Sequence, residues 1–232
     1  MLKKVLAAVL AICMMFAALT ACGIKKKDDG AGIAASGPKK NSSEKDAAAA
    51  KKEIDDALDT LEEAGVELDD DLQEMLENID EADIEAAQAA RATDVKISVD
   101  APEGWTVENN DYANYSAVNG MRTFMVMCSE EPSGVSDIAA YAKNNQDKMK
   151  TVFSEAEYSD ITSVNIDGTK GGRFHIDLEI FGLKQRQIYV YYCKDGLVTV
   201  VQGCYIMGMG DDEAESEAEI NKMIDSVRVE KR

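Results

Sequence analysis

The feature that most constrains the fold of this chain is a change in composition near residue 93. From there to the C-terminus, aromatic and β-branched residues occur together, in short stretches with the alternation of β-strands. A stretch of about 140 residues is long enough to bury a core of its own. Residues 93–232 are therefore expected to form the one globular domain.

The order of the expected elements in this domain gives its fold class. Three strands come first, then a helix, four strands and a closing helix. This order predicts an α+β fold, an antiparallel β-sheet with helices packed against it. The helices are expected from Ser136 to about residue 153 and from Asp211 or Asp212 to near the C-terminus. The strands are expected at 96–99, in the stretch through Tyr115, and at 122–128, 161–166, 170–180, 184–193 and 197–206.

One hairpin is predicted from Asp195-Gly196, which favours a type I′ turn. Its register places Cys193 opposite Val198, so Cys204 lies about 20 Å farther along at ~3.3 Å per residue. Bridged Cα atoms lie within about 7 Å, so this register excludes a disulfide between Cys193 and Cys204. Cys128 stays open as a partner for either, and small buried thiols are the simpler interpretation.

A second hairpin is predicted around Phe181-Gly182. If these two residues form the turn, Glu179 faces Lys184 and Asp177 faces Arg186. Both pairs are opposite in charge, and such cross-strand pairs stabilise a sheet. The charges therefore favour this register.

The sole histidine, His175, is the first candidate for catalysis. Alternation puts it on one strand face with Arg173 and Asp177, and a His-Asp pair could form half of an acid–base dyad. Asp177 already has Arg186 opposite it, however, and no serine or cysteine stands in a strained-turn motif. No C-x-x-C motif suggests a metal site either. We expect no catalytic residue, no metal and no cofactor.

A group of tyrosines and methionines near the last hairpin is the candidate binding patch. Adaptable Met and Tyr side chains suit a binding surface, although the same residues can simply cover the core beneath a helix. The group consists of Tyr189, Tyr191, Tyr192, Tyr205, Met207 and Met209.

The N-terminus carries the pattern of an exported, lipid-anchored protein. Two lysines precede an apolar run that is shorter than the roughly 20 residues needed to span a membrane. The run ends in Leu19-Thr20-Ala21-Cys22, which resembles the lipobox of bacterial lipoproteins. The resemblance implies that the signal peptide, residues 1–21, is removed and that Cys22 carries a diacylglyceryl group at the extracytoplasmic face of the cell membrane.

Two segments separate Cys22 from the domain. Residues 22–43 are rich in Gly, Ala, Ser and Lys and are predicted to be a flexible tether. Residues 44–92 are acidic, and their apolar or small residues recur at alternating steps of four and three, which predicts helices with a heptad seam. We interpret this segment as a helical spacer. A coiled coil that binds a partner or self-associates, and a cation-binding acidic region, are the alternatives.

Net charge limits the possible partners. The chain has a formal charge of -19, and loss of residues 1–21 removes two lysines and no acid, which leaves -21. A chain with this much negative charge repels phosphate, and we therefore expect no nucleic-acid partner. The body would also be repelled by an anionic membrane, so the lipid on Cys22 must hold it there.

Three stretches of the domain resemble PsbP-like domains: 97–105, 164–168 and 223–227. In that family a strand runs into a Pro-x-Gly-Trp turn, and the last helix ends just before a short strand. The resemblance implies an α/β/α sandwich and a role in assisting membrane-bound assemblies, and it brings no shared catalytic motif. The expected function is that of a non-catalytic accessory or protein-interaction module with a protein partner in the envelope. The alternative is a lipoprotein that binds a small ligand and delivers it to a transporter.

Overall fold

The computed structural model describes residues 91–110, 113–130, 137–180, 182–208 and 212–232, together with helical residues at 51, 52, 55, 56, 58 and 59. The predicted signal peptide, the tether and Cys22 lie outside the described residues. So do most of segment 44–92, Ser136, Phe181 and Met209.

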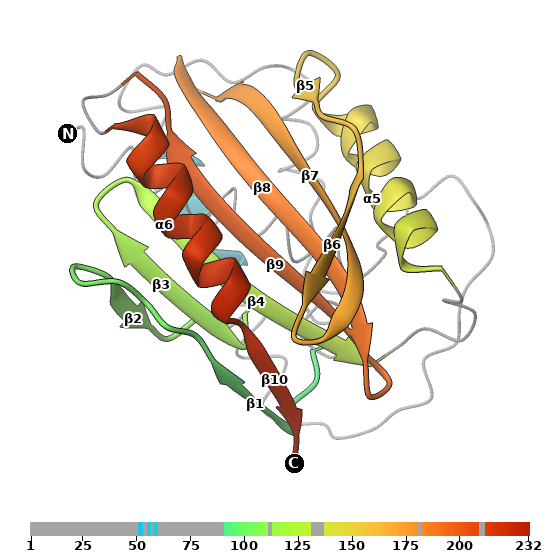
Figure 1. Ribbon diagram of the computed structural model, residues 1–232. Coiled ribbons are helices and arrows are strands. Elements are labelled where there is room, and N and C mark those ends of the chain that lie inside the picture. The colour runs from blue at the N-terminus through green and yellow to red at the C-terminus, as the bar shows by residue number, and fades with distance from the viewer. Residues whose placement is uncertain are drawn as a thin grey trace.

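An antiparallel sheet of eight strands organises the described part of the chain (Figure 1). The strands are β2 (Thr106–Glu108), β3 (Tyr115–Asn119), β4 (Arg122–Glu130), β5 (Glu157–Tyr158), β6 (Thr162–Ile166), β7 (Thr169–Ile180), β8 (Leu183–Lys194) and β9 (Leu197–Ile206). They follow the order β2-β3-β4-β9-β8-β7, and β7 pairs with both β5 and β6 on its other side. A two-stranded sheet pairs β1 (Val95–Ser98) with β10 (Arg228–Lys231).

Helices cover opposite faces of the large sheet. They are α5 (Ile138–Val152) and α6 (Glu213–Ser226). The Tyr141 ring of α5 lies edge-on to Tyr191 of β8, with 6.0 Å between ring centroids. Ile220 of α6 lies against Gly203, which pairs with Ile188 of β8. Because side chains 188 and 191 point to opposite sides of a strand, the sheet has an α5 face and an α6 face. The predicted fold class, an antiparallel sheet with helices packed against it, is confirmed.

Aspartate side chains begin both helices. Asp212 Oδ1 accepts hydrogen bonds from the N–H groups of Ala214 and Glu215 at 2.9 and 3.4 Å, which confirms one of the two predicted starts of α6. For α5 the cap is Asp137, which accepts from Ala139 N–H at 2.9 Å. The prediction of Ser136 was wrong by one residue, because the carboxylate of Asp137 accepts the N–H groups of Ala139 and Ala140 and caps the helix. Among the described residues no helix is long and apolar enough to cross a membrane.

Both predicted hairpins are confirmed. Asp195 and Gly196 have φ angles of 53° and 73°, as the central residues of a type I′ turn require. Asp177 pairs with Arg186, and the same ladder joins Glu179 to Lys184. Cys193 pairs with Val198, and Cys204 lies farther along the hairpin, opposite Gln187. This register keeps Cys193 and Cys204 too far apart for a disulfide, as predicted.

The main core lies between the sheet and α6. Trp105, from the Pro-x-Gly-Trp turn, packs against this core, and its indole N–H donates to Glu219 Oε2 of α6 at 2.9 Å. Arg122 of β4 contacts the same carboxylate at 2.8 Å. Fully buried members of this core include Ala117, Phe124, Val126, Val190, Tyr192, Val201, Met223 and Val227.

Candidate functional site

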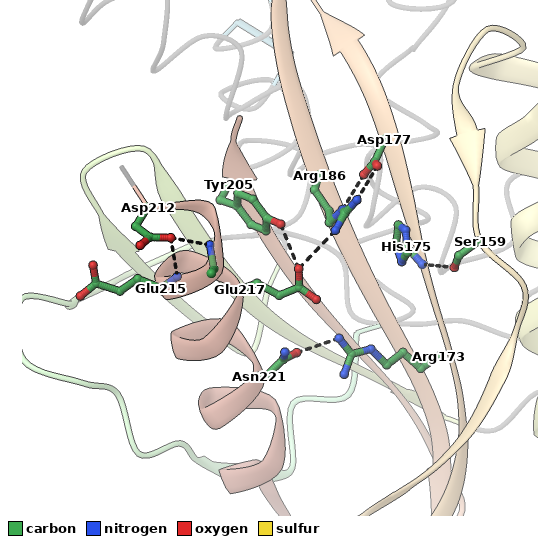
Figure 2. A network of polar contacts seen from close by, with 11 residues as sticks. Ser159, Arg173, His175, Asp177, Arg186, Tyr205, Asp212, Glu215, Glu217 and Asn221 are labelled. Atoms are coloured by element: carbon green, nitrogen blue, oxygen red, sulfur yellow. Dashed lines mark hydrogen bonds and ion pairs between the residues drawn. The ribbon is translucent and has the colours of Figure 1, made fainter. Parts of the chain in front are cut away.

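A strip of charged side chains lies on the α6 face, where β7 and β8 run beside α6 (Figure 2). Arg173, His175 and Asp177 come from β7, Arg186 comes from β8, and Glu217 comes from α6. The three β7 residues are two positions apart, so they project from one side of the strand. We call these five residues the charged strip.

Arg186 is the centre of the charged strip. Its Nε and Nη2 atoms donate to the two carboxylate oxygens of Asp177 at 2.7 and 2.6 Å, and Nη1 donates to Glu217 Oε2 at 3.2 Å. The hydroxyl of Tyr205 donates to the same Glu217 oxygen at 3.2 Å. The hydrogen bond to Asp177 is the main cause that raises the pKa of Arg186. A planar guanidinium thus joins two strands and a helix through a bidentate and a single contact.

The charged strip remains partly open to solvent. The side chains of Arg186, Asp177 and Glu217 are 25, 22 and 36% exposed. At the other end of the strip, Arg173 Nη2 donates to Asn221 Oδ1 of α6 at 2.7 Å. These side chains are therefore held in one arrangement and can still be reached from solvent.

His175 lies between these two arginine contacts. Its backbone N–H donates to Ser159 Oγ at 2.9 Å. Burial is the main cause that lowers the pKa of the imidazole, and the positive charge of Arg186 lowers it further. The Asp177 oxygens that a dyad would need are engaged by Arg186.

The lowered pKa of His175 predicts a pH-dependent stability. The folded protein favours the neutral imidazole, so the unfolded chain binds more protons as the pH falls below ~6.5. The contribution of His175 to stability is present above that pH and is lost on acidification until the folded-state histidine also titrates. In urea unfolding, wild type should therefore lose stability relative to His175→Gln between pH 8 and pH 5. A constant difference between the two proteins would contradict the assignment.

The predicted binding patch is divided between the two faces of the sheet. Tyr189 and Tyr191 lie on the α5 face, where both rings stack on Phe174, at 5.3 and 6.0 Å between centroids. Tyr205 lies on the α6 face beside Glu217. All three tyrosines are buried, Tyr192 belongs to the core under α6, and Met207 packs against that core. A binding role for these residues stays a prediction.

Sequence analysis missed a buried polar cluster on the α5 face. Tyr189 donates to Gln187 Oε1 at 2.6 Å, and Gln202 Nε2 donates to the same oxygen at 3.2 Å. Gln202 Oε1 and the Tyr191 hydroxyl are buried without a hydrogen-bond partner. The signal was available in β8, where glutamine and tyrosine occupy alternate positions from Gln185 to Tyr191 and therefore share one face.

Within the described ranges, no group of three or more His, Cys, Asp or Glu side chains could hold a metal ion. Cys128 is buried, which raises the pKa of its thiol to about 11. Since the thiolate is the nucleophile, Cys128 is unreactive at neutral pH.

No protein-family model and no curated protein matches this chain. Solved structures do match it. LpqN of Mycobacterium tuberculosis, described as involved in cell envelope biogenesis, is 13% identical with a TM-score of 0.45, and the match covers 58% of this chain and 83% of LpqN. The cyanobacterial PsbP of Synechocystis sp. PCC 6803 is 14% identical with a TM-score of 0.44, and the match covers 60% of this chain and 94% of that one. A PsbP protein is thus among the solved structures that match this chain.

Proposed function

We propose that this protein is a non-catalytic accessory module of the cell envelope that acts by binding a protein partner through the charged strip. The observation that carries the proposal is the geometry of Arg186, Asp177 and Glu217, which are fixed by mutual hydrogen bonds and still 22 to 36% exposed. Side chains that are ordered before association lose little conformational entropy when a partner covers them. Arginine is also enriched among the residues that dominate binding energy at interfaces.

The chemistry of the same residues supports binding over catalysis. A general base must be able to accept a proton and must be oriented by a second group. The Asp177 carboxylate is occupied by Arg186 and does not orient the imidazole, while burial, together with the positive charge of Arg186, lowers the pKa of His175 and makes it a weaker base. These contacts serve to hold charges in place. The small-ligand alternative was motivated by the tyrosine and methionine patch, and Tyr205 of that patch lies on the face away from Tyr189 and Tyr191.

The proposed location rests on Cys22. A diacylglyceryl group anchors a protein stably because each buried methylene contributes about 0.8 kcal/mol. Replacement Cys22→Ala should move nearly all of the protein from the membrane fraction into the soluble fraction or the medium, as measured by fractionation and immunoblotting. The matched control is Cys13→Ala, which changes a cysteine inside the predicted signal peptide and should leave the protein membrane-bound. Retention of Cys22→Ala on the membrane would refute the anchor.

Partner binding should depend on the charged strip. Arg173→Glu reverses the charge at one end of the strip and removes the hydrogen bond to Asn221. We expect it to reduce the yield of partner adducts after cross-linking in intact cells by about tenfold, as for an interface hot spot.

Lys170→Glu is the matched control for this experiment. It makes the same change of charge on the same strand, but an odd number of positions away, so its side chain projects from the other side of β7. Adduct yields should match wild type. Equal yields from Arg173→Glu and wild type would show that the partner binds elsewhere.

A further inference from the structure

The α5 face of β4 and β9 is buried, although the described helix on that side lies elsewhere. Met125 and Met127 of β4 are 1 and 6% exposed, and their cross-strand neighbours Gln202 and Val200 are equally inaccessible. Gln202 also pairs with Tyr189, which fixes these four residues on the α5 face. The helix α5 packs on β7 and β8. We call Met125, Met127, Val200 and Gln202 the methionine face, and it requires a cover other than α5.

We infer that residues 44–90 of the acidic helical segment fold back and cover the methionine face of the same chain. This inference goes beyond the proposed function. It changes the role of the segment from a spacer between membrane and domain to a third helical layer of the domain. The partner-binding charged strip then lies on the side of the sheet opposite to this layer.

The described residues of the segment show burial on one side of a helix. Lys51 and Leu58 are partly buried, and seven residues is close to two helical turns, so both lie on one helix face. Two ion pairs, Lys51–Asp55 and Lys52–Asp56, each join residues four positions apart, which is the spacing of neighbours on a helix surface. In Figure 1 the pale blue pieces of this helix are drawn behind the sheet, on the side away from α6. The exposed residues are Lys52, Asp55, Asp56 and Asp59.

Chain connectivity brings the segment to the correct strand. Arg91 forms an antiparallel bridge with Ser129 of β4, and the N–H of Ala92 donates to Cys128 O at 2.7 Å. Arg91 Nη1 also donates to the carbonyl oxygens of Asn110 and Ala113, at 3.3 and 3.1 Å. The segment thus ends beside the strand that carries Met125 and Met127. A tether this short gives docking on the same chain a high effective concentration over docking on another.

The chemistry of the two surfaces is complementary. The seam of the segment is apolar or small, with Ile54, Leu58 and Leu61 in its first half, whereas its many carboxylates fall outside the seam. The methionine face carries no ionised group, and methionine adapts its shape to irregular surfaces. Burial of the seam there leaves the acidic side chains in water, which is the arrangement of an amphipathic helix on a sheet.

Methionine oxidation in the full-length chain tests this inference. With dilute peroxide and mass spectrometry, Met125 and Met127 should be protected in wild type. Leu58→Asp puts a charge into the seam and should raise their oxidation rates about tenfold by promoting local opening. The control Lys52→Asp introduces the same residue on the exposed side and should change nothing. Met223 of α6 and Met149 of α5, both buried, report whether the rest of the domain stays folded.

Equal oxidation rates of Met125 and Met127 in wild type and Leu58→Asp would overturn the inference. Should Leu58→Asp unfold the whole domain, exposing Met223 as well, lysine cross-linking of wild type decides. In a mixture of isotopically light and heavy chains, cross-links from Lys51 or Lys52 to domain lysines should join two light or two heavy peptides, as expected within one chain. Mixed-label cross-links would assign the cover to a second copy, and a lack of any such cross-link would also overturn the inference.

Discussion

Replacing Gly203 with alanine should lower the free energy of unfolding by about 2 to 3 kcal/mol, because it overpacks the core beneath α6. A Cβ atom at position 203 would lie 2.2 Å from Cγ2 of Ile220, far inside van der Waals contact. Ile220 is fully buried, and its Cγ2 methyl is carried by a branched Cβ with one strongly preferred χ1 rotamer in a helix, so moving it aside is costly. Either α6 must move away from β9 or the contact must be strained. Urea unfolding of the two proteins measures the loss.

Two further variants separate this clash from a general effect of removing a glycine. Gly172→Ala would place a Cβ 3.1 Å from the Ala142 Cβ, a milder contact, and should cost less than Gly203→Ala. Ile220→Ala alone should cost about 2 to 5 kcal/mol by leaving a cavity. In the double variant the new methyl occupies that cavity. The loss of stability should therefore be smaller than the sum of the losses in the two single variants. Full additivity would contradict the predicted contact.

Replacing Arg186 with alanine should cost about 2 kcal/mol, between the values for exposed and fully buried ion pairs. The loss leaves the carboxylates of Asp177 and Glu217 close together and partly buried without the guanidinium that separates them. Arg186→Lys keeps the charge but not the bidentate fork, so it should fall between alanine and wild type. Unfolding in urea at low and high salt measures the change.

The control for Arg186 is an ion pair in water. Lys143 and Asp147 of α5 are in contact, and about half of each side chain is exposed. Lys143→Ala should change stability by less than about 0.5 kcal/mol. If Arg186→Ala cost no more than Lys143→Ala, the charged strip would not be a fixed arrangement.

Local chemistry explains why the hairpins could be predicted. Asp195-Gly196 specifies its turn by residue type, and the Asp177 and Arg186 charges report their register directly. The same register places the members of the predicted binding patch on two faces of the sheet. Tyr205 lies opposite Arg186, an even-numbered position of β8, whereas Tyr189 and Tyr191 are odd-numbered and project from the other side. Proximity in sequence was the weaker guide.

Contacts between distant elements could not be read from periodicity. The charged strip needs Glu217 from α6 to reach Arg186, and the pairing of Ile97 with Val229 joins the two ends of the domain. Neither contact has a local signal, because helix position over a sheet is set by packing, as at Gly203 and Ile220. Four of the five residues of the charged strip could be placed together from strand alternation and hairpin register, and Glu217 was the one that only the fold could supply.

The most direct test of the central claim is site-specific photo-cross-linking in intact cells. A photoreactive amino acid replaces His175, inside the charged strip, and in a second strain it replaces Lys170, on the other side of the same strand. Irradiation followed by mass spectrometry should give a discrete adduct with an envelope protein from position 175 and none from position 170. The absence of a protein adduct at position 175, or the same adduct from both positions, would contradict binding through the charged strip.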